Sequence, residues 1–368
     1  MAIGFDSSWP SLSFDVEIYN LMKRIFLLST LAIVISFVSC SKDGDGNENF
    51  TGVVTVTQKG TLKSLLQKYG LMDATQLTIA GTLGDADFET LIDLTFYNKL
   101  ESLDLSDVNI SILPTQALWG ARLTSIILPE NLEEIGLHAL SETRIEMITI
   151  PPSVLTIAER AFDRCKQLRT VIFSSNAQLK TIAGEETAYS GGAFSNCEAL
   201  SAISIPASVE MIGERAFLGC TSLRTITFQP NSRLKTIGRL AFITCPITSI
   251  EVPASIERLE STFSGCTSLK SVRFQAGSQL RTIDDFAFQS CPLESLDASN
   301  CSYITDISFN SLTFSKATLT LVQIRTRIPP RCNYAWSVPK NATLRVPIGC
   351  VDAYKNAEGW KNFTYISE

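Results

Sequence analysis

Residues with the chemistry of a catalytic or metal site are scarce in this sequence. His138 is the only histidine, so the side chain that most often serves as general base or zinc ligand occurs once in 368 residues. The ten cysteines include no Cys-x-x-Cys pair, which excludes a thioredoxin-like redox motif and a paired zinc knuckle. A hydrolase would have to use His138 as its base, and we interpret that residue instead as a surface or structural histidine. The sequence predicts no enzyme, no cofactor and no metal.

One acidic segment imitates the start of a calcium-binding loop. Asp43, Asp45 and Asn47 have the spacing of its first ligands, but Glu48 stands where the loop needs glycine. Val54 stands where the loop needs a bidentate glutamate. We therefore reject a calcium site. Small, charged and polar residues of this kind cannot bury enough surface to fold, so the segment suits a flexible tether.

The N-terminal region has the pattern of an export signal. Lys23 and Arg24 precede an apolar run at 25–38, which at 14 positions is shorter than the roughly 20 residues that span a bilayer. The run ends in Phe-Val-Ser-Cys at 37–40, which resembles the bacterial lipobox, although leucine is usual where Phe37 stands. That resemblance implies that Cys40 is acylated and becomes the first residue. An ordinary secretory signal with an incidental cysteine is the alternative.

The residues before this signal are unusual for an exported chain. Trp9, Pro10, Asp15 and Glu17 lie ahead of the positive residues, whereas Met22 directly precedes them. We expect translation to begin at Met22.

Composition excludes one large class of partners. The formal net charge is −6 and the pI is near 5.1, whereas nucleic-acid binding relies on clustered lysine and arginine that displace counterions from phosphates. No nucleic-acid partner is expected. A chain with 45% hydrophobic and 18% charged residues can bury a large core.

Internal repetition is the strongest pattern in the sequence. An Ala-Phe pair recurs, with Thr-Phe at 262–263 as a variant, and a cysteine follows each phenylalanine after two residues. The cysteines of this motif are Cys165, Cys197, Cys220, Cys245, Cys266 and Cys291. Their separations of 32, 23, 25, 21 and 25 residues, by subtraction, lie close to the roughly 20 to 29 residues of leucine-rich repeats.

Each repeat carries two short apolar segments. After Cys220, for example, Ile226 and Phe228 alternate as on one face of a strand, and Leu234 and Ile237 form a second apolar pair. A single repeat cannot bury its own apolar side, so neighbours must stack. We predict a repeat solenoid, of the leucine-rich, β-rich α/β kind, with a parallel strand ladder and a buried column of corner phenylalanines.

The repeated cysteines have three interpretations. A small apolar thiol packs well in a tight corner, which we favour over a disulfide ladder or a metal-binding stack. If Cys40 is lipidated, nine cysteines remain, so at least one cannot pair within the chain. A bridge between Cys332 and Cys350 stays open.

These motifs resemble a known family. The pattern Ile-Pro-x-Ser-Val at 205–209, followed by Ile-Gly-x-x-Ala-Phe-x-x-Cys at 212–220, resembles the BspA-like leucine-rich repeats of bacterial surface proteins. The likeness covers roughly 123–296. It implies a right-handed curved coil with the strand ladder on its concave face, closed by terminal caps. It also implies adhesion to host proteins, including extracellular-matrix and plasma proteins, and no catalytic residue.

The predicted organisation follows from the signal, the repeats and the caps. The segments are a removed signal region at 1–39, a lipidated cysteine and tether at 40–50, an N-terminal cap at 51–107, repeats at 108–315 and a C-terminal cap at 316–368. In the last segment we interpret Trp360 and Phe363 as cap core, because end repeats must cover their apolar faces.

The sequence departs from the repeat pattern in two places. Leu140 and Thr143 replace the corner phenylalanine and cysteine of an early repeat. Residues 183–192 lengthen another repeat, and this insertion carries Glu185, Glu186 and Tyr189. Such a loop can carry function, or it is a tolerated surface insertion.

The outward strand positions are the predicted ligand-binding face. They include Arg169, Thr170, Arg224, Thr225, Thr227, Glu251, Lys270, Arg273, Glu294 and Asp297. The face is polar and mixed in charge, and Arg224, Lys270 and Arg273 make a modest basic stripe on it. Because these positions include no aromatic residue, they favour a protein ligand, although any one of them could simply be solvated.

We therefore expect an outer-membrane lipoprotein, exposed at the cell surface, whose repeats bind a protein. A glycan-capture lipoprotein is the first alternative and would need Trp119, Tyr189 or Trp336 to lie together. A structural scaffold role in the cell envelope is the second.

Overall fold

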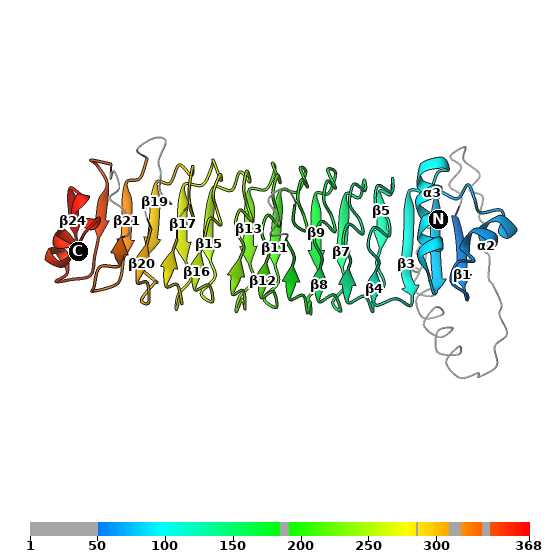
Figure 1. Ribbon diagram of the computed structural model, residues 1–368, viewed down its shortest axis with the longest axis horizontal. Coiled ribbons are helices and arrows are strands. Elements are labelled where there is room, and N and C mark those ends of the chain that lie inside the picture. Colours follow the sequence, from blue (N-terminus) through cyan, green and yellow to red (C-terminus); the bar gives the residue numbers. More distant parts are fainter. Residues whose placement is uncertain (1–50, 185–190, 285, 309–317, 333–338) are drawn as a thin grey trace, which may run out of the picture. The chain divides into compact units, whose positions relative to one another are not determined.

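The computed structural model describes residues 51–184, 191–284, 286–308, 318–332 and 339–368 (Figure 1). All described residues belong to one compact unit. Several predictions fall outside the described residues. These are the signal region, Cys40 and its tether, the loop residues Glu185, Glu186 and Tyr189, the aromatic residue Trp336 and the repeat boundary at 315.

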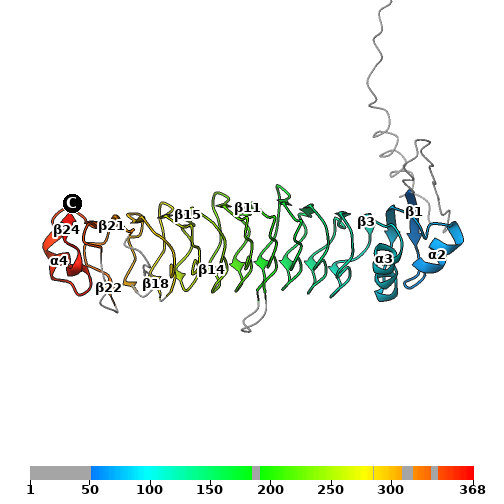
Figure 2. The same cartoon turned by 90° about the horizontal axis from the view of Figure 1, so that it is seen from above.

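The N-terminal segment alternates strands and helices. Its elements are β1 (Thr51–Val56), α2 (Leu62–Tyr69), β2 (Gln76–Gly81), α3 (Asp85–Tyr97) and β3 (Ser102–Val108). The strands form a parallel sheet in the order β1-β2-β3-β5, so the sheet of this segment continues into the first repeat. In α3, Phe88, Leu91 and Leu94 recur at three-residue spacing, and their side chains are buried in the core. Figure 2 shows both helices on the side of the ladder where the repeats carry their short strands.

Each repeat contributes one longer strand to a parallel ladder. These strands are β5 (Ser125–Ile127), β7 (Met147–Ile150), β9 (Thr170–Phe173), β11 (Ala202–Ile205), β13 (Thr225–Phe228), β15 (Ser249–Val252), β17 (Ser271–Phe274), β19 (Ser295–Ala298) and β21 (Leu321–Ile324). Neighbouring strands pair in register, as Ile250 does with Val272 and Val272 with Leu296. This register places one row of β-branched and leucine side chains inside the coil. The ladder is interrupted between β5 and β7, β9 and β11, and β13 and β15, where the strands still lie side by side.

A second parallel ladder runs along the coil from two-residue strands. They are β4 (Ile112–Leu113), β6 (Glu134–Ile135), β8 (Thr156–Ile157), β10 (Thr181–Ile182), β12 (Met211–Ile212), β14 (Thr236–Ile237), β16 (Arg258–Leu259), β18 (Thr282–Ile283), β20 (Asp306–Ile307) and β22 (Arg331–Cys332). This ladder is interrupted between β14 and β16. The second residue of each of the first nine strands is a buried isoleucine or leucine. The predicted second apolar segment of each repeat is therefore a strand in its own right.

The corners bring the chain back between the two ladders. In the corner from Arg215 to Gly219, Arg215 has a φ of 54° and Gly219 a φ of 73°. One corner therefore contains two residues with left-handed backbone conformation. The N–H of Phe217 donates to the carbonyl of Ala241 in the next turn at 2.9 Å, and Phe194 donates in the same way to Ala216. These bonds satisfy corner backbone groups that would otherwise be buried unpaired.

The corner phenylalanines form the predicted column. Consecutive rings from Phe162 to Phe288 are nearly parallel, with centroids 5.0 to 5.7 Å apart and interplanar angles of 15° or less. All six rings are buried. The repeat solenoid with a parallel strand ladder is confirmed, as a coil of about 12 turns.

The C-terminal segment closes the coil with aromatic side chains. It consists of β23 (Thr343–Arg345), α4 (Val351–Asn356), a 3₁₀ turn at Trp360–Asn362 and β24 (Tyr365–Ser367), and both strands extend the long-strand ladder. Trp360 and Phe363 are buried, and the indole N–H of Trp360 donates to the carbonyl of Pro330 at 2.8 Å. The prediction that these two residues are cap core is confirmed. Within the described ranges, no helix is long and apolar enough to cross a membrane.

Candidate ligand-binding surfaces

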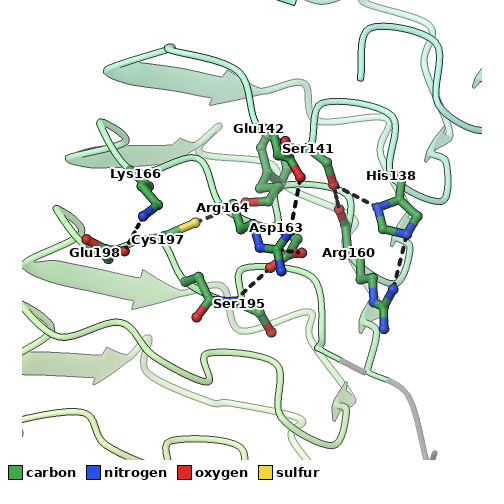
Figure 3. Close-up of polar contacts among 12 residues, drawn as sticks. His138, Ser141, Glu142, Arg160, Asp163, Arg164, Lys166, Ser195, Cys197 and Glu198 are labelled. Atoms are coloured by element: carbon green, nitrogen blue, oxygen red, sulfur yellow. Dashed lines mark hydrogen bonds and ion pairs between the residues drawn. The ribbon is translucent and has the colours of Figure 1, made fainter. Parts of the chain in front are cut away.

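His138 lies in a polar network at the corner of an early repeat (Figure 3). The buried Ser141 hydroxyl donates its proton to the carbonyl of Arg160 at 2.6 Å, and its oxygen lies 3.0 Å from Nδ1 of His138. Since the serine proton is already used, Nδ1 must be the donor in that contact. Nε2 then accepts from the Arg160 guanidinium at 3.4 Å. This imidazole is oriented to link two turns, which is the arrangement of a structural histidine.

Other contacts near His138 join successive turns. Arg164 pairs with Glu142 at 3.2 Å across one step, and the Asn196 amide donates to Asp163 at 3.0 Å across the next. Most of these side chains reach the solvent, so their contribution to stability is small. The network joins successive turns of the coil.

The repeated cysteines are thiols directed along the coil. Each of the six donates to the carbonyl of the corner residue in the preceding turn at 3.0 to 3.2 Å, as Cys220 does to Phe194. Burial raises the pKa of the Cys165 thiol to about 12 and that of Cys197 well above its ordinary value. Such thiols are poor nucleophiles, because the thiolate is the reactive form.

The metal and disulfide interpretations find no geometry in the described residues. Histidine, cysteine and carboxylate groups do not gather there in threes as a metal ion would need. Cys332 and Cys350 are not bridged, and no two of the described cysteines form a disulfide with each other.

The outward side chains of the long strands form a continuous surface, here called the ladder face. In the repeats its central row contains Ile127, Thr149, Ile172, Ser204, Thr227, Glu251, Arg273 and Asp297. The predicted residues Thr227, Glu251 and Arg273 belong to that row and are exposed. Arg169, Arg224, Lys270 and Glu294 directly precede their strands and are exposed at its margin. The structure therefore brings all seven predicted strand residues to one side of the coil.

The basic residues of the ladder face have acidic neighbours in adjacent turns. The Lys270 ammonium lies 2.8 Å from the Glu294 carboxylate in the next turn. Arg273 stands in register between Glu251 and Asp297. Two of the three predicted basic residues thus have acidic neighbours, and the stripe alternates in sign. The sequence predicted a face of mixed charge, but it could not show which charges are neighbours, because residues in adjacent turns are more than 20 positions apart.

The ladder face carries an apolar patch that sequence reasoning also missed. Ile127, Met147 and Ile172 are 53%, 56% and 42% exposed on β5, β7 and β9, which lie side by side. Met147 pairs with Thr170, two residues before Ile172, so the two side chains are diagonal neighbours on one face. The two-residue alternation of these strands would have placed all three outward.

A shallow hollow continues this patch towards the N-terminus. It has a volume of about 290 Å³ and is lined by residues of β1, β2, β3 and β5. Val53, Thr78, Asp104 and Ile127 are consecutive partners across these strands and therefore form one row of its floor.

The comparison with protein families decides the relationship of this coil. The model of the BspA type leucine rich repeat region, in six copies, matches residues 90–186 and 187–317. The chain belongs to the BspA type leucine rich repeat family. The resemblance inferred from the corner motif is thereby confirmed, and the family match extends beyond 123–296 in both directions.

Solved structures that match this BspA type chain have low identity to it. A leucine-rich repeat protein of Bacteroides ovatus is 18% identical, with a TM-score of 0.43, over 92% of this chain and all of that one. The pneumococcal vaccine antigen PcpA is 17% identical, with a TM-score of 0.39, over 80% and 79% of the two chains. The leucine-rich repeat protein of T. pallidum is 18% identical, with a TM-score of 0.36, over 72% and 89%. A search of curated proteins found no significant match.

One departure from the BspA type repeat is explained by the structure. Leu140 is buried at the place of the corner phenylalanine, and its N–H donates to Ala161 as the N–H of Phe162 donates to Ala193. Thr143 takes the place of the cysteine, with its hydroxyl 2.9 Å from the Leu140 carbonyl and 3.3 Å from the Cys165 sulfur. The hydroxyl thus lies against the corner carbonyl of its own turn, whereas each thiol donates to the corner carbonyl of the preceding turn.

Proposed function

We propose that this BspA type chain is a cell-envelope lipoprotein whose ladder face binds a protein. The observation that carries the proposal is the patch of Ile127, Met147 and Ile172, which exposes apolar side chains where stacking of the coil does not require them. Contiguous exposed apolar residues rimmed by polar ones mark protein-binding surfaces. Threonines and serines surround the patch, and the alternating charges from Glu251 to Asp297 extend it.

A protein ligand fits this surface better than a glycan does. The central row of the ladder face in the repeats offers aliphatic side chains for burial and paired charges for orientation, whereas sugars need aromatic rings to stack on. Extracellular-matrix and plasma proteins are the candidate ligands. No catalytic step is proposed.

The binding test uses the chain from Ser41 to Glu368 with a panel of extracellular-matrix and plasma proteins. The test variants are Met147→Asp/Ile172→Asp and the charge reversal Arg224→Glu/Lys270→Glu/Arg273→Glu. Met211→Asp is the matched control, because Met211 is also exposed at the start of a strand, but in the short-strand ladder. Saturable binding that disappears in Met147→Asp/Ile172→Asp and persists in Met211→Asp supports the proposal.

Other outcomes redirect the assignment. Equal loss in the Met211→Asp control would place the ligand elsewhere on the coil. Absence of binding to every panel protein would favour glycan capture or a scaffold role.

The membrane anchor is tested separately in cells. We propose that Cys40 is acylated and that the mature chain is displayed from the outer membrane. Metabolic labelling with a fatty acid should mark the wild-type protein and not Cys40→Ser. External protease should degrade the labelled protein on intact cells, and protection from protease would refute surface display.

A further inference from the structure

A cleft lies between α3 and the first corner of the coil, away from the ladder face. It has a volume of about 370 Å³. Its lining residues are Asp85, Phe88, Glu89 and Ile92 from the helix and Pro114, Thr115, Gln116, Ala117 and Trp119 from the corner. The helical residues are spaced three and four apart, so they share one face of α3. Two segments that meet only in the folded chain therefore build this cleft.

Trp119 is not explained by the packing of the coil. It follows the corner residue Leu118, and the equivalent residues of later turns are Ser141, Asp163, Ser195, Leu218, Ile243, Ser264 and Gln289. None of these is aromatic, so the corner does not need a ring at this place. Trp119 is 46% exposed, and its ring meets that of His138 at a centroid distance of 6.2 Å. An exposed indole in the wall of a cleft is a contact surface for a ligand.

The charge of the cleft has one sign. Asp85 and Glu89 are its only ionisable lining residues, and both are exposed and separated by one helical turn. Neither carboxylate forms an ion pair with a lysine or arginine of the described ranges. Two carboxylates that lack a positive partner favour a cation between them and repel an anion.

The helix terminus beside the cleft does not change this preference. The N-terminus of a helix attracts anions through its unpaired N–H groups. Beside this terminus lies the buried Asp87, whose carboxylate accepts from the N–H of Gly84, which precedes α3, and from those of Gly60 and Leu62 at the start of α2, at 2.6 to 2.9 Å. A negative charge is therefore already present at the terminus and would repel an anionic ligand.

We propose that this cleft binds a lysine or arginine side chain presented by a protein partner. The methylene stem of such a side chain lies against Ile92 and the Trp119 ring, and its charged head reaches Asp85 and Glu89. The indole face attracts the cation, and the carboxylates accept its N–H groups. The site is separate from the ladder face and does not depend on the function proposed for that face.

Fluorine NMR of the chain from Ser41 to Glu368, labelled with 5-fluorotryptophan, tests the site directly. This chain contains three tryptophans, Trp119, Trp336 and Trp360. The probes are capped glycine-rich peptides that carry one central lysine or arginine, their norleucine and glutamate counterparts, and a neutral oligosaccharide. The lysine and arginine peptides should shift the Trp119 resonance saturably, and added salt should weaken that binding.

Variants identify which groups bind the cation. Asp85→Asn/Glu89→Gln keeps the shape of the cleft and should weaken binding about tenfold, a change equivalent to about 1.4 kcal/mol. Asp93→Asn is the matched control, because Asp93 is an exposed carboxylate of α3 that does not line the cleft. Trp119→Ser introduces the residue found at the equivalent positions 141, 195 and 264, and it should fold and lose binding.

Several results would overturn the proposal. A Trp119 shift of equal size with the norleucine peptide would show apolar contact without charge recognition. Binding of the oligosaccharide in preference to the cationic peptides would assign the cleft to glycans. Unchanged affinity in Asp85→Asn/Glu89→Gln, or no saturable shift with any peptide, would refute it. Met147→Asp/Ile172→Asp should leave cleft binding unchanged, so this test and that of the ladder face fail independently.

Discussion

Truncation of one phenylalanine in the corner column tests how the coil is held together. Phe217 is fully buried, and its ring is parallel to those of Phe194 and Phe242, each at a centroid distance of 5.4 Å. Phe217→Ala leaves a cavity between two rings that the backbone cannot close, because both neighbouring turns are fixed by corner hydrogen bonds. Burial and cavity terms predict a loss of about 3 to 5 kcal/mol. Two ring contacts of about 0.5 to 1.5 kcal/mol each place the expected value in the upper part of that range.

The assay is guanidinium unfolding of the chain from Ser41 to Glu368, followed by far-UV circular dichroism. Phe217→Leu is the matched variant, since Leu140 occupies the same corner position in an earlier turn with the same backbone bond. It should lose only about 1 to 2 kcal/mol. Phe286→Ala is the surface control, because Phe286 is 42% exposed, and its effect should stay within about 0.5 kcal/mol.

The combination with Phe242→Ala measures whether the column acts as a unit. If adjacent rings stabilise each other, the double variant should lose less than the sum of the single losses, by about 0.5 to 1.5 kcal/mol. Additive losses, or a loss in Phe217→Ala no larger than that in Phe286→Ala, would refute the reasoning.

Four further tests concern other parts of the coil. The folded chain should leave the thiols of Cys165 and Cys197 unalkylated at pH 8, while the denatured chain should react fully; fast labelling of the native protein would contradict their burial. Burial raises the pKa of Cys165 from 9.0 to about 12, so its contribution to stability is complete below pH 9 and should decline above it by about 1.4 kcal/mol per pH unit, measured against Cys165→Ala. Trp360→Ala removes a buried ring of the C-terminal cap and its bond to Pro330, and thermal unfolding should show a loss of about 3 to 5 kcal/mol. Gly213→Ala would place a methyl group 2.1 Å from the backbone nitrogen of Gly184 in the adjacent turn. The substitution should therefore lower the free energy of unfolding by about 1 to 3 kcal/mol. An unchanged unfolding midpoint would show that the two turns can move apart.

The parts of the fold that repeat could be predicted from the sequence. The corner phenylalanine and cysteine recur in six turns, so packing that is ambiguous for one residue becomes clear from the series. The two helices of the N-terminal segment occur once each, and α2 is only eight residues long. Sequence reasoning predicted a cap there without its helices, because a single short amphipathic segment has no repeat to support it.

The parts that depend on contacts between turns were harder to predict. The pair Lys270 and Glu294 spans 24 residues, and the spacing of turns varies between 21 and 32, so neighbours across the ladder cannot be read from a fixed period. The outward apolar residues Met147 and Ile172 lie in strands whose inward residues are also apolar. Their strands therefore look like short buried runs, and only the alternation distinguishes the two faces.

Stacking also explains where function is to be sought in this coil. The inward residues, the corner rings and the thiols are each required by the turn above or below, so their identity says nothing about a ligand. Residues that a turn does not require stand out by comparison with the equivalent positions of other turns. Trp119 is one such residue, because later turns have small, polar or aliphatic residues at its position. Met147 is another, because its partner in the next strand is Thr170. An exposed apolar side chain that stacking does not explain lowers solubility unless a partner covers it. Such a side chain therefore indicates a binding surface, and each of the two proposed surfaces contains one.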